Sequence, residues 1–522
     1  MTADKQIKLG ATLSYAQMAL NVIVGLLYTP LMIRLLGQSE FGLYNTVAST
    51  ISMLSVLNLG FGSGYIRYFA KYKARNDTES ISKLNGLFLI IFLIIGIVAF
   101  LCGLFLTYRL DLVFDQGLSP SEYETAKVLM FLLTINLAVS FPMSVFSNII
   151  SANERFVFLK LLGMLKTIGS PLLTIPLLLL GYGSVAVVSV TLTIAVTVDA
   201  VYMFYVFRVL RNRFVFRDFE RGIFRNLFAY TAFIALNIII DQINWNVDRV
   251  ILGRYRGTAA VAVYSVGGAL QTYYQMFSTS ISGIFTPRIH HMVNSEASSA
   301  EKSRVLTSLF IKIGRIQYLI LGLICTELIF FGREFIHFWA GSGYDEAYVV
   351  ALMLIIPVTI PLIQNLGIEI QRAQNRHQFR SFTYAVMASV NLLLSIYLAQ
   401  KYGATGAAFG TTISLLLANG LVMNIYYQKK CAINVILFWK NIGRISVGLL
   451  IPIVCGCLLR RFFDFNLLLH LALGIFVYAV IYALSMWFLG MNAEERNMFS
   501  AVLKKISGVR KVRRYDKDRE PG

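Results

Sequence analysis

Charged residues are scarce in this chain of 522 residues. Asp, Glu, Lys and Arg make up 14% of it, against roughly 25% in soluble domains, and the mean hydropathy is +0.66. The deficit comes from charge-free runs at 9–33, 41–66, 84–108, 128–153, 257–287, 347–368, 402–428 and 465–493. Each run is long enough to cross ~30 Å of hydrocarbon as a helix. This pattern excludes an ordinary soluble protein and predicts an all-α polytopic membrane protein.

Fourteen transmembrane helices are expected along the chain. Their approximate limits are 9–33, 42–66, 84–107, 127–150, 159–180, 184–207, 226–252, 258–283, 309–332, 346–369, 381–400, 403–426, 442–459 and 466–489. The first run follows basic residues but is too long for a cleaved signal peptide, so it is expected to remain a span.

Cysteine and histidine are also rare, with five of each. Four cysteines fall in apolar spans and show no disulfide or zinc spacing. No histidine has a recognisable partner, so we assign no metal site. The sequence contains no Walker lysine motif, and ATP is therefore not expected as the direct energy source. No catalytic group or cofactor site is legible, which predicts a protein that is not an enzyme.

Basic residues are distributed unevenly between the two sides of the predicted membrane. With the amino terminus in the cytoplasm, 36 of the 47 Lys and Arg residues lie in cytoplasmic segments and nine in outer segments, while Lys166 and Arg249 lie within spans. The positive-inside rule then places both termini in the cytoplasm. The net charge of +20 is thus mostly a topology signal, and its scatter over many loops argues against nucleic-acid binding.

The sequence contains a faint internal repeat. "LNVIVGLLYTPLMIRLLG" ends at Gly37 and "LNIIIDQINWNVDRVILG" ends at Gly253, an offset of 216. After four inserted residues the offset is 220: it matches Tyr44 with Tyr264, Tyr182-Gly183 with Tyr402-Gly403, and Thr191 with Thr411. Agreement at both ends of a six-span unit predicts two related bundles in parallel orientation, with a site between them.

The repeat suggests a division of the chain into five parts. These are an N-terminal six-helix lobe (1–207), a basic cytoplasmic linker (208–225), a C-terminal six-helix lobe (226–428), two extra transmembrane helices (429–489) and a basic cytoplasmic tail (490–522). The two lobes are expected to be related by a pseudo-two-fold axis along the membrane normal.

Several segments resemble one family of transporters. "LGATLSYAQMALNVIVGLLYTPLMIRLLGQSEFGLYNTVAS", "LNLGFGSGYIRYFAKYKARND", "VDRVILGRY" and "KYGATGAAFGTTIS" are similar to sequences of oligosaccharide flippases in the multidrug/oligosaccharidyl-lipid/polysaccharide exporter superfamily. The resemblance covers roughly residues 8–490. It implies two six-span lobes around a central cavity, alternating access, and transport of lipid-linked sugars across the bacterial inner membrane. The family has no short catalytic motif to transfer.

A polar stripe interrupts the apolar segment "NIIIDQINWNVDRVIL". On a helix, Asn237, Asp241, Asn244 and Asp248 fall within about a 60° arc. Charges in a span face a bundle interior or water rather than lipid. The stripe is therefore a candidate cavity wall, with a polar clasp between helices as the alternative.

Two charges of this segment have distinct candidate roles. Arg249 is suited to bind a phosphate or a sugar carboxylate, because its guanidinium stays charged and offers a fork of donors. Asp241 lies deeper and would be neutralised by a proton, a sodium ion or a basic neighbour, so H⁺ or Na⁺ coupling is one option. Asp248 and Arg249 also lie near the outer end of the span, where an interfacial position is the alternative.

Four further charges complete the candidate substrate cavity. Lys166 and Asp199 lie at similar depth on neighbouring antiparallel spans, either as a structural pair or with Lys166 lending positive potential to the cavity. Arg34 and Arg67 lie at opposite ends of the first two spans, where each side chain is able to snorkel to a headgroup. Arg67 also lies where a cytoplasm-facing cavity would receive a pyrophosphate.

Three functions remain open from the sequence. The first is a flippase for an undecaprenyl-diphosphate-linked oligosaccharide in surface polysaccharide or lipopolysaccharide synthesis. Its expected partners are that substrate, membrane lipids and polysaccharide-assembly proteins. The second is a cation-coupled small-molecule exporter of the same superfamily. The third is a membrane polysaccharide polymerase or ligase, although the outer loops carry no catalytic constellation.

Overall fold

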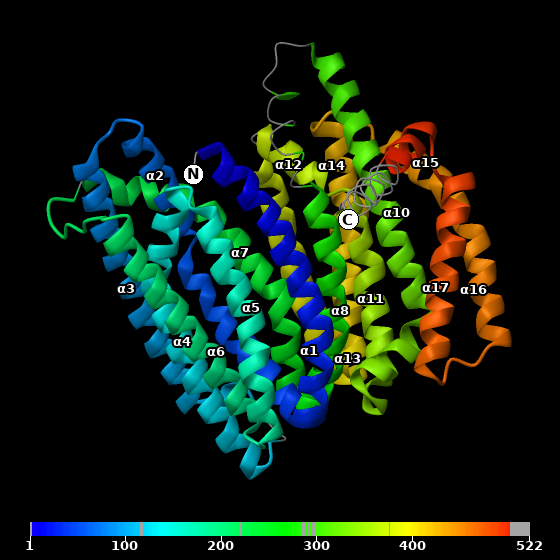
Figure 1. Cartoon of the computed structure of the whole chain (residues 1–522), viewed down its shortest axis with the longest axis horizontal. Coiled ribbons are helices and arrows are strands. Elements are labelled where there is room, and N and C mark those ends of the chain that lie inside the picture. The colour runs from blue at the N-terminus through cyan, green and yellow to red at the C-terminus, as the bar shows by residue number, and fades with distance from the viewer. Residues whose placement is uncertain are drawn as a thin grey trace, which may run out of the picture. The chain divides into compact units, whose positions relative to one another are not determined.

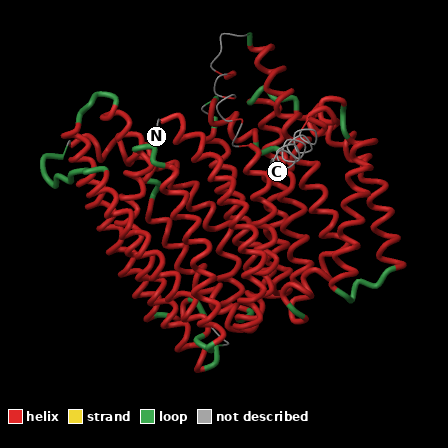
Figure 2. The backbone as a smooth tube through the Cα atoms, viewed as in Figure 1, coloured by secondary structure: helices red, strands yellow, loops and turns green. Residues whose placement is uncertain are grey.

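The computed structural model describes residues 3–114, 118–219, 221–282, 298–374 and 376–501, together with Phe285, Ile289, Met292 and Val293. Within these residues the chain forms helices joined by short turns, and no strand occurs (Figure 2). The part of the basic tail after residue 501 lies outside the described residues.

The long helices follow the order expected for a multi-pass protein (Figure 1). In the first part of the chain they are α1 (Ala3–Met53), α2 (Phe61–Lys73), α3 (Thr78–Tyr108), α4 (Pro120–Ala152), α5 (Phe156–Leu179), α6 (Gly183–Phe204), α7 (Arg221–Tyr255) and α8 (Thr258–Ser282). The second part contains α10 (Ser299–Ala340), α11 (Asp345–Ile363), α12 (Leu366–Ala373), α13 (His377–Leu415), α14 (Met423–Lys430), α15 (Val435–Ser446), α16 (Leu450–Phe462) and α17 (Leu468–Ser485).

Nine helical segments among the described residues are long and apolar enough to cross a membrane. Two of them, Thr12–Lys73 and Gln378–Lys430, are long enough to hold two predicted spans each. The three remaining predicted spans correspond to α7, α8 and α10. The all-helical, multi-pass fold class predicted from the sequence is therefore confirmed.

Local sequence signals set several helix ends. The side chain of Asp77 accepts a hydrogen bond from the backbone N–H of Ser80 and caps α3. Hydrogen bonds from Ser80 hold the pKa of Asp77 below its usual value. Ser119 and Glu122 form a capping box at the start of α4, with Pro120 in the first turn.

The helices group into two compact units. Unit 1 comprises Met1–Met276, Ile336–Val358 and Arg376–Val422, and unit 2 comprises Phe277–Phe335, Thr359–Asn375 and Met423–Gly522. These boundaries differ from those of the predicted lobes, because they cut through α8, α10 and α11. The lobe boundaries at 207 and 226 stay a prediction.

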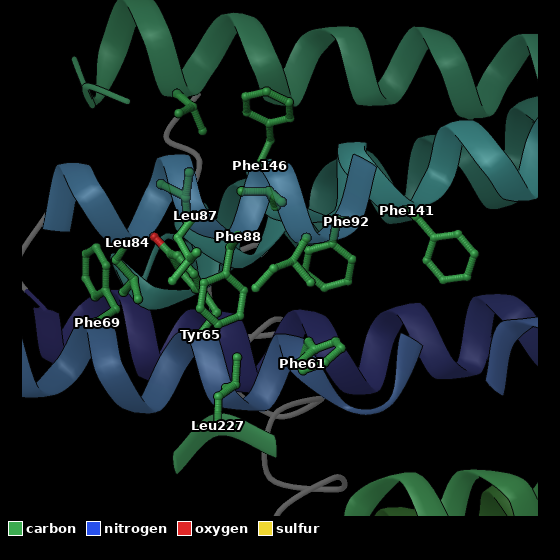
Figure 3. Close-up of a cluster of buried hydrophobic side chains, with 14 of the residues drawn as sticks. Phe61, Tyr65, Phe69, Leu84, Leu87, Phe88, Phe92, Phe141, Phe146 and Leu227 are labelled. Atoms are coloured by element: carbon green, nitrogen blue, oxygen red, sulfur yellow. The ribbon is translucent and has the colours of Figure 1, made fainter. Parts of the chain in front are cut away.

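Aromatic side chains dominate one core of unit 1 (Figure 3). Phe61 and Tyr65 of α2 pack on Phe88 and Phe92 of α3, with all four side chains 2% exposed or less. Buried Asn85 accepts a hydrogen bond from the Tyr65 hydroxyl at 2.6 Å. Its amide donates at 3.0 Å to the Arg213 carbonyl. The core thus binds part of the basic linker directly to α3.

Left-handed glycines mark equivalent turns in the two sequence halves. Gly37, at φ 77°, produces the kink in α1, and Gly257, at φ 80°, separates α7 from α8. Gly183 and Gly403 have φ of 58° and 62°. Both pairs have an offset of 220. The structural equivalent of Gly37 is therefore Gly257, whereas the sequence repeat matched Gly37 with Gly253. The four inserted residues lengthen α7 by about one helical turn.

Unit 2 includes the last two long helices, α16 and α17, which pack against each other (Figure 1). Phe331 of α10 packs edge-on against Tyr478 of α17 and against Phe465. The Tyr482 hydroxyl of α17 donates to the Leu319 carbonyl of α10 at 2.8 Å. These contacts attach the helix pair to α10 within the unit.

Candidate functional site

The polar stripe of α7 has different surroundings along its length. Asp248 is 1% exposed, Asn237 and Asn244 are half-buried, and Asp241 is exposed. The helical angle alone predicted one common environment for all four side chains. The structure separates a buried end at Asp248 from an accessible part around Asp241.

Asp248 lies in a buried cluster of hydroxyl and amide groups. Tyr264 of α8 donates to its Oδ2 at 2.6 Å, and Thr411 of α13 donates to the same oxygen at 2.7 Å. Next to them, Thr411 and Ser395 contact Asn391 Oδ1 at 3.3 and 3.2 Å. We call these five residues the Asp248 cluster. Asp248 is therefore held inside unit 1 by neighbouring helices, and its position along the membrane normal stays a prediction.

The Asp248 cluster leaves two polar atoms without a hydrogen bond among the described residues. They are Oδ1 of Asp248 and Nδ2 of Asn391, both buried. A buried carboxylate supported only by hydroxyl groups is costly as a bare anion. A proton or a small cation at the free oxygen would remove that cost. The cluster is therefore suited to proton or cation binding.

Arg249 is half-buried and forms no ion pair with a carboxylate among the described residues. Its Nη1 donates weakly to Asn246 at 3.4 Å, and its buried Nε has no hydrogen bond. The bonded oxygen of Asp248 is engaged by Tyr264 and Thr411 instead. Within the described part of the chain, no carboxylate forms an ion pair with Arg249. The charge of Asp248 nevertheless acts on Arg249.

Asp241 has a basic neighbour that the sequence analysis did not include. Arg380 of α13 acts electrostatically on Asp241, and its guanidinium lies 4.6 Å from the centre of the Tyr384 ring. One turn before Asp241 on α7, Asn237 accepts a hydrogen bond from Ser381 at 3.0 Å. The start of α13 therefore faces the accessible part of the stripe.

Lys166 and Asp199 lie on α5 and α6, which pack together. Lys166 is exposed and Asp199 is half-buried, and the charge of Lys166 acts on Asp199. Next to Lys166, Thr167 donates to Asn21 of α1 at 2.8 Å. This placement is compatible with both alternatives. Lys166 and Asp199 would form a structural pair, or Lys166 would lend positive potential to the cavity.

Arg34 and Arg67 are exposed and lie on different helices, α1 and α2. Arg34 donates at 2.5 Å to the Phe338 carbonyl, in the last turn of α10, where a cation complements the helix dipole. This bond gives Arg34 a structural role at that helix end. Arg67 lies on α2, which packs against α3, α4 and α7.

The two sequence halves contact each other through α1 within unit 1. Trp339 Nε1 donates to the Leu26 carbonyl at 2.8 Å, and Gln38 donates to the Gly343 carbonyl at 3.1 Å. The Ser39 and Thr258 hydroxyls lie 2.8 Å apart. We call these three contacts the α1 seam. In the topology predicted from the sequence, Gln38 and Ser39 follow the first span on its outer side.

Comparison with known proteins identifies the family. The sequence profile described as polysaccharide biosynthesis protein matches residues 10–293, more than half of the chain. The chain belongs to this family. The resemblance predicted from the sequence is thereby confirmed.

Relatives of this polysaccharide biosynthesis family member include transport proteins. The chain is 20% identical over 406 residues to "Putative O-antigen transporter" of Shigella flexneri, covering 76% of this chain and 92% of the relative. The structure resembles "Lipid II flippase MurJ, inward closed conformation" with a TM-score of 0.69, at 15% identity and 91% and 98% coverage. It also resembles the MATE multidrug transporter DinF-BH with a TM-score of 0.57, at 14% identity and 81% and 94% coverage. The chain is thus a multi-pass membrane protein with the fold of these solved transporters.

Sequence reasoning missed Arg380 and the donors around Asp248. Tyr264 and Thr411 entered the sequence analysis only as markers of the repeat. The signal was nevertheless present, because a polar residue retained at the same place in both halves is a candidate for one shared site. Arg380 lay just outside the predicted limits of its span and was therefore assigned to a loop.

Proposed function

We propose that this protein is a flippase for a lipid-linked oligosaccharide, of the undecaprenyl-diphosphate type, in the bacterial inner membrane. It would move the sugar unit outward by alternating access for surface polysaccharide synthesis, with both termini in the cytoplasm. The family membership supports this function most directly. The observation that carries the substrate class is Arg249, a guanidinium next to the polar stripe that forms no ion pair with a carboxylate among the described residues.

The chemistry of the substrate fits this arrangement. A diphosphate needs cationic donors in a place sheltered from water, and the fork of an arginine matches phosphate oxygens. Arg249 and Arg380 present two such groups near the stripe, and Arg67 and Lys166 are further candidates. The amides of Asn237 and Asn244 provide neutral hydrogen-bonding groups for sugar hydroxyls.

The α1 seam supports a cycle with two end states. It joins helices of both sequence halves by a few neutral hydrogen bonds, each worth only about 1 kcal/mol net. Such a seam is able to open at modest cost when substrate binding favours the other state. In this cycle the two six-helix lobes predicted from the repeat would rock about the site.

The Asp248 cluster favours cation coupling and supports the second candidate function, a cation-coupled small-molecule exporter. Coupling would also serve a flippase, because a proton or sodium ion at Asp248 links substrate movement to an ion gradient. The two functions differ in the need for Arg249, because a cationic drug would be repelled by it.

The experiment is a deletion strain complemented with variants. Without the protein, the lipid-linked unit should still be assembled but surface polysaccharide should be lost. Arg249→Gln should restore less than about a tenth of surface polysaccharide, and Arg249→Lys an intermediate amount, since a charge-assisted bond contributes about 1.5–3 kcal/mol. Arg461→Gln, at an exposed arginine of α16, is the matched control. Loss of the assembled unit itself would instead favour a polymerase or ligase.

Full export by Arg249→Gln together with lost resistance to cationic drugs in the deletion strain would favour the small-molecule exporter.

A further inference from the structure

Unit 2 contains a cavity that is separate from the α7 site. Its volume is about 500 Å³, and it lies between α10, α15 and the helical residues 493–501. Both polar and apolar side chains line it. No role in transport explains this cavity, and the inference drawn from it is independent of the proposed function.

A buried ion pair forms the rigid wall of the cavity. Arg315 of α10 is 4% exposed, and it donates to both carboxylate oxygens of Glu495 at 2.6 and 2.8 Å. It also donates to the carbonyls of Asn441 in α15 and of Gly490, both at 3.0 Å. Glu495 and Asn492 additionally cap the final helix reciprocally. Arg315 therefore fixes three chain segments around the cavity.

The mouth of the cavity carries two basic side chains two helical turns apart on α10. Arg304 is exposed, and within the described residues it forms no hydrogen bond or ion pair. Lys312 pairs with Glu494 at 2.9 Å, but half or more of each side chain is exposed. Exposed pairs of this kind contribute little and exchange partners easily. An incoming anion would thus meet one free cation and one that is easily released.

The remaining wall is apolar and lies where the protein enters the membrane. Ile311, Ile316, Leu437 and Met498 line this part. Beyond Arg315, α10 carries no charge until Glu327. The neighbouring α15 buries one apolar face and leaves Leu437 exposed. The cavity therefore spans the boundary between polar and apolar surroundings, the level of lipid phosphate groups.

We infer that this cavity binds an anionic phospholipid. The headgroup phosphate would lie between Arg304 and Lys312, with Glu494 displaced from Lys312, and an acyl chain would lie along Ile311 and Leu437. Basic pockets between membrane helices bind anionic headgroups in this way. A free phosphate shares the headgroup chemistry but would leave the apolar wall unused.

The test measures lipid binding to the purified full-length protein by native mass spectrometry. Phosphatidylglycerol should bind more tightly than phosphatidylcholine, which has the same chains and no net charge. Arg304→Gln and Lys312→Gln should each weaken phosphatidylglycerol binding about fivefold, the effect of about one basic group at a membrane surface. Lys430→Gln, at an exposed lysine of α14 outside the cavity, should leave binding unchanged.

A second variant keeps the inference testable if the charge changes disturb folding. Ser308 lines the cavity, and Ser308→Trp should block the bound lipid without altering any charge. Equal binding of the two lipids, or equal effects of Lys430→Gln and Arg304→Gln, would overturn the inference. Competition by glycerol 3-phosphate at the same concentration as phosphatidylglycerol would show a site for free phosphate and reject the lipid.

Discussion

At the scale of single residues, Asp248 and Arg249 show how neighbours in sequence acquire different chemistry. Asp248 turns toward α8 and α13 and accepts two hydroxyl hydrogen bonds. Arg249, 100° further round α7, faces Asn246 and the Gly268 region. The first is suited to a proton or cation and the second to an anion, so the proposed coupling and substrate groups are adjacent residues on different faces of α7.

Asp248→Asn should preserve the fold and abolish coupled transport. The amide oxygen still accepts from Tyr264 and Thr411, so the melting temperature in detergent should change by less than a few degrees. Export should fall by at least about tenfold, because a neutral amide takes up no proton at physiological pH and lacks the negative charge that favours a cation. Tyr264→Phe tests the reverse case: it leaves a buried acceptor with one donor fewer and should cost about 1–3 kcal/mol of stability.

Asp111→Asn, at an exposed aspartate, is the control for a general effect of charge loss. Wild-type export by Asp248→Asn would remove the coupling role and leave the cluster as a polar clasp.

At the scale of elements, close contact between α1 and α8 depends on a missing side chain. A Cβ at Gly42 would lie 1.8 Å from the Thr258 carbonyl oxygen, which is backbone at the start of α8. Gly42→Ala should therefore push these helices apart, at a cost of about 1–3 kcal/mol, and lower the melting temperature. Thermal unfolding in detergent measures the change.

Gly443→Ala on α15 is the matched control, because nothing lies within 4 Å of a Cβ there. The control should be neutral or stabilising by up to ~1 kcal/mol. Equal melting temperatures for the two variants would show that α1 and α8 leave room for a Cβ at position 42.

The face of α7 can be mapped with single cysteines in a protein whose five native cysteines are replaced. A small hydrophilic thiol reagent should react fastest at position 241, more slowly at 237 and 244, and least at 248, following their exposure. Substrate should change the rate at 241 if the site alternates between two states. Uniform rates around the helix, with Leu236 and Val247 included, would contradict a water-filled site.

The sequence predicted the elements better than their contacts. Charge-free runs and capping residues depend on local physics, so the spans and the start of α4 were predictable. The contact of Asp248 with Thr411 joins residues 163 positions apart, and only packing decides it. The helical angle predicted that Asp241 and Asp248 share one face of α7. It could not predict that α8 and α13 bury Asp248 and leave Asp241 exposed, because that also depends on packing.

At the scale of the whole molecule, charge asymmetry makes a prediction about topology. A reporter that is active only in the cytoplasm should be active when fused after Gly490. It should also be active when fused after Arg217, within the basic linker. A reporter that is active only outside should work in the loop near Asp111. External activity at Gly490 would reverse the orientation and place the anionic-lipid cavity in the opposite leaflet.

The left-handed glycines also determine how the halves correspond. With the offset of 220, Tyr44 and Tyr264 are equivalent, as are Thr191 and Thr411, whereas the first half has no carboxylate at the place of Asp248, which is Tyr28 with this offset and Met32 with the offset of 216. Duplication thus supplied two similar frames, of which only one carries a carboxylate.

This single carboxylate limits the energy available to the proposed cycle. A transporter driven through the Asp248 cluster would carry at most one cation per substrate. One elementary charge crossing a potential of 100 mV supplies ~2.3 kcal/mol, which corresponds to a concentration ratio of about fiftyfold. The voltage-driven part of the gradient that coupling through the Asp248 cluster would sustain therefore follows from the first half having no carboxylate at the equivalent place.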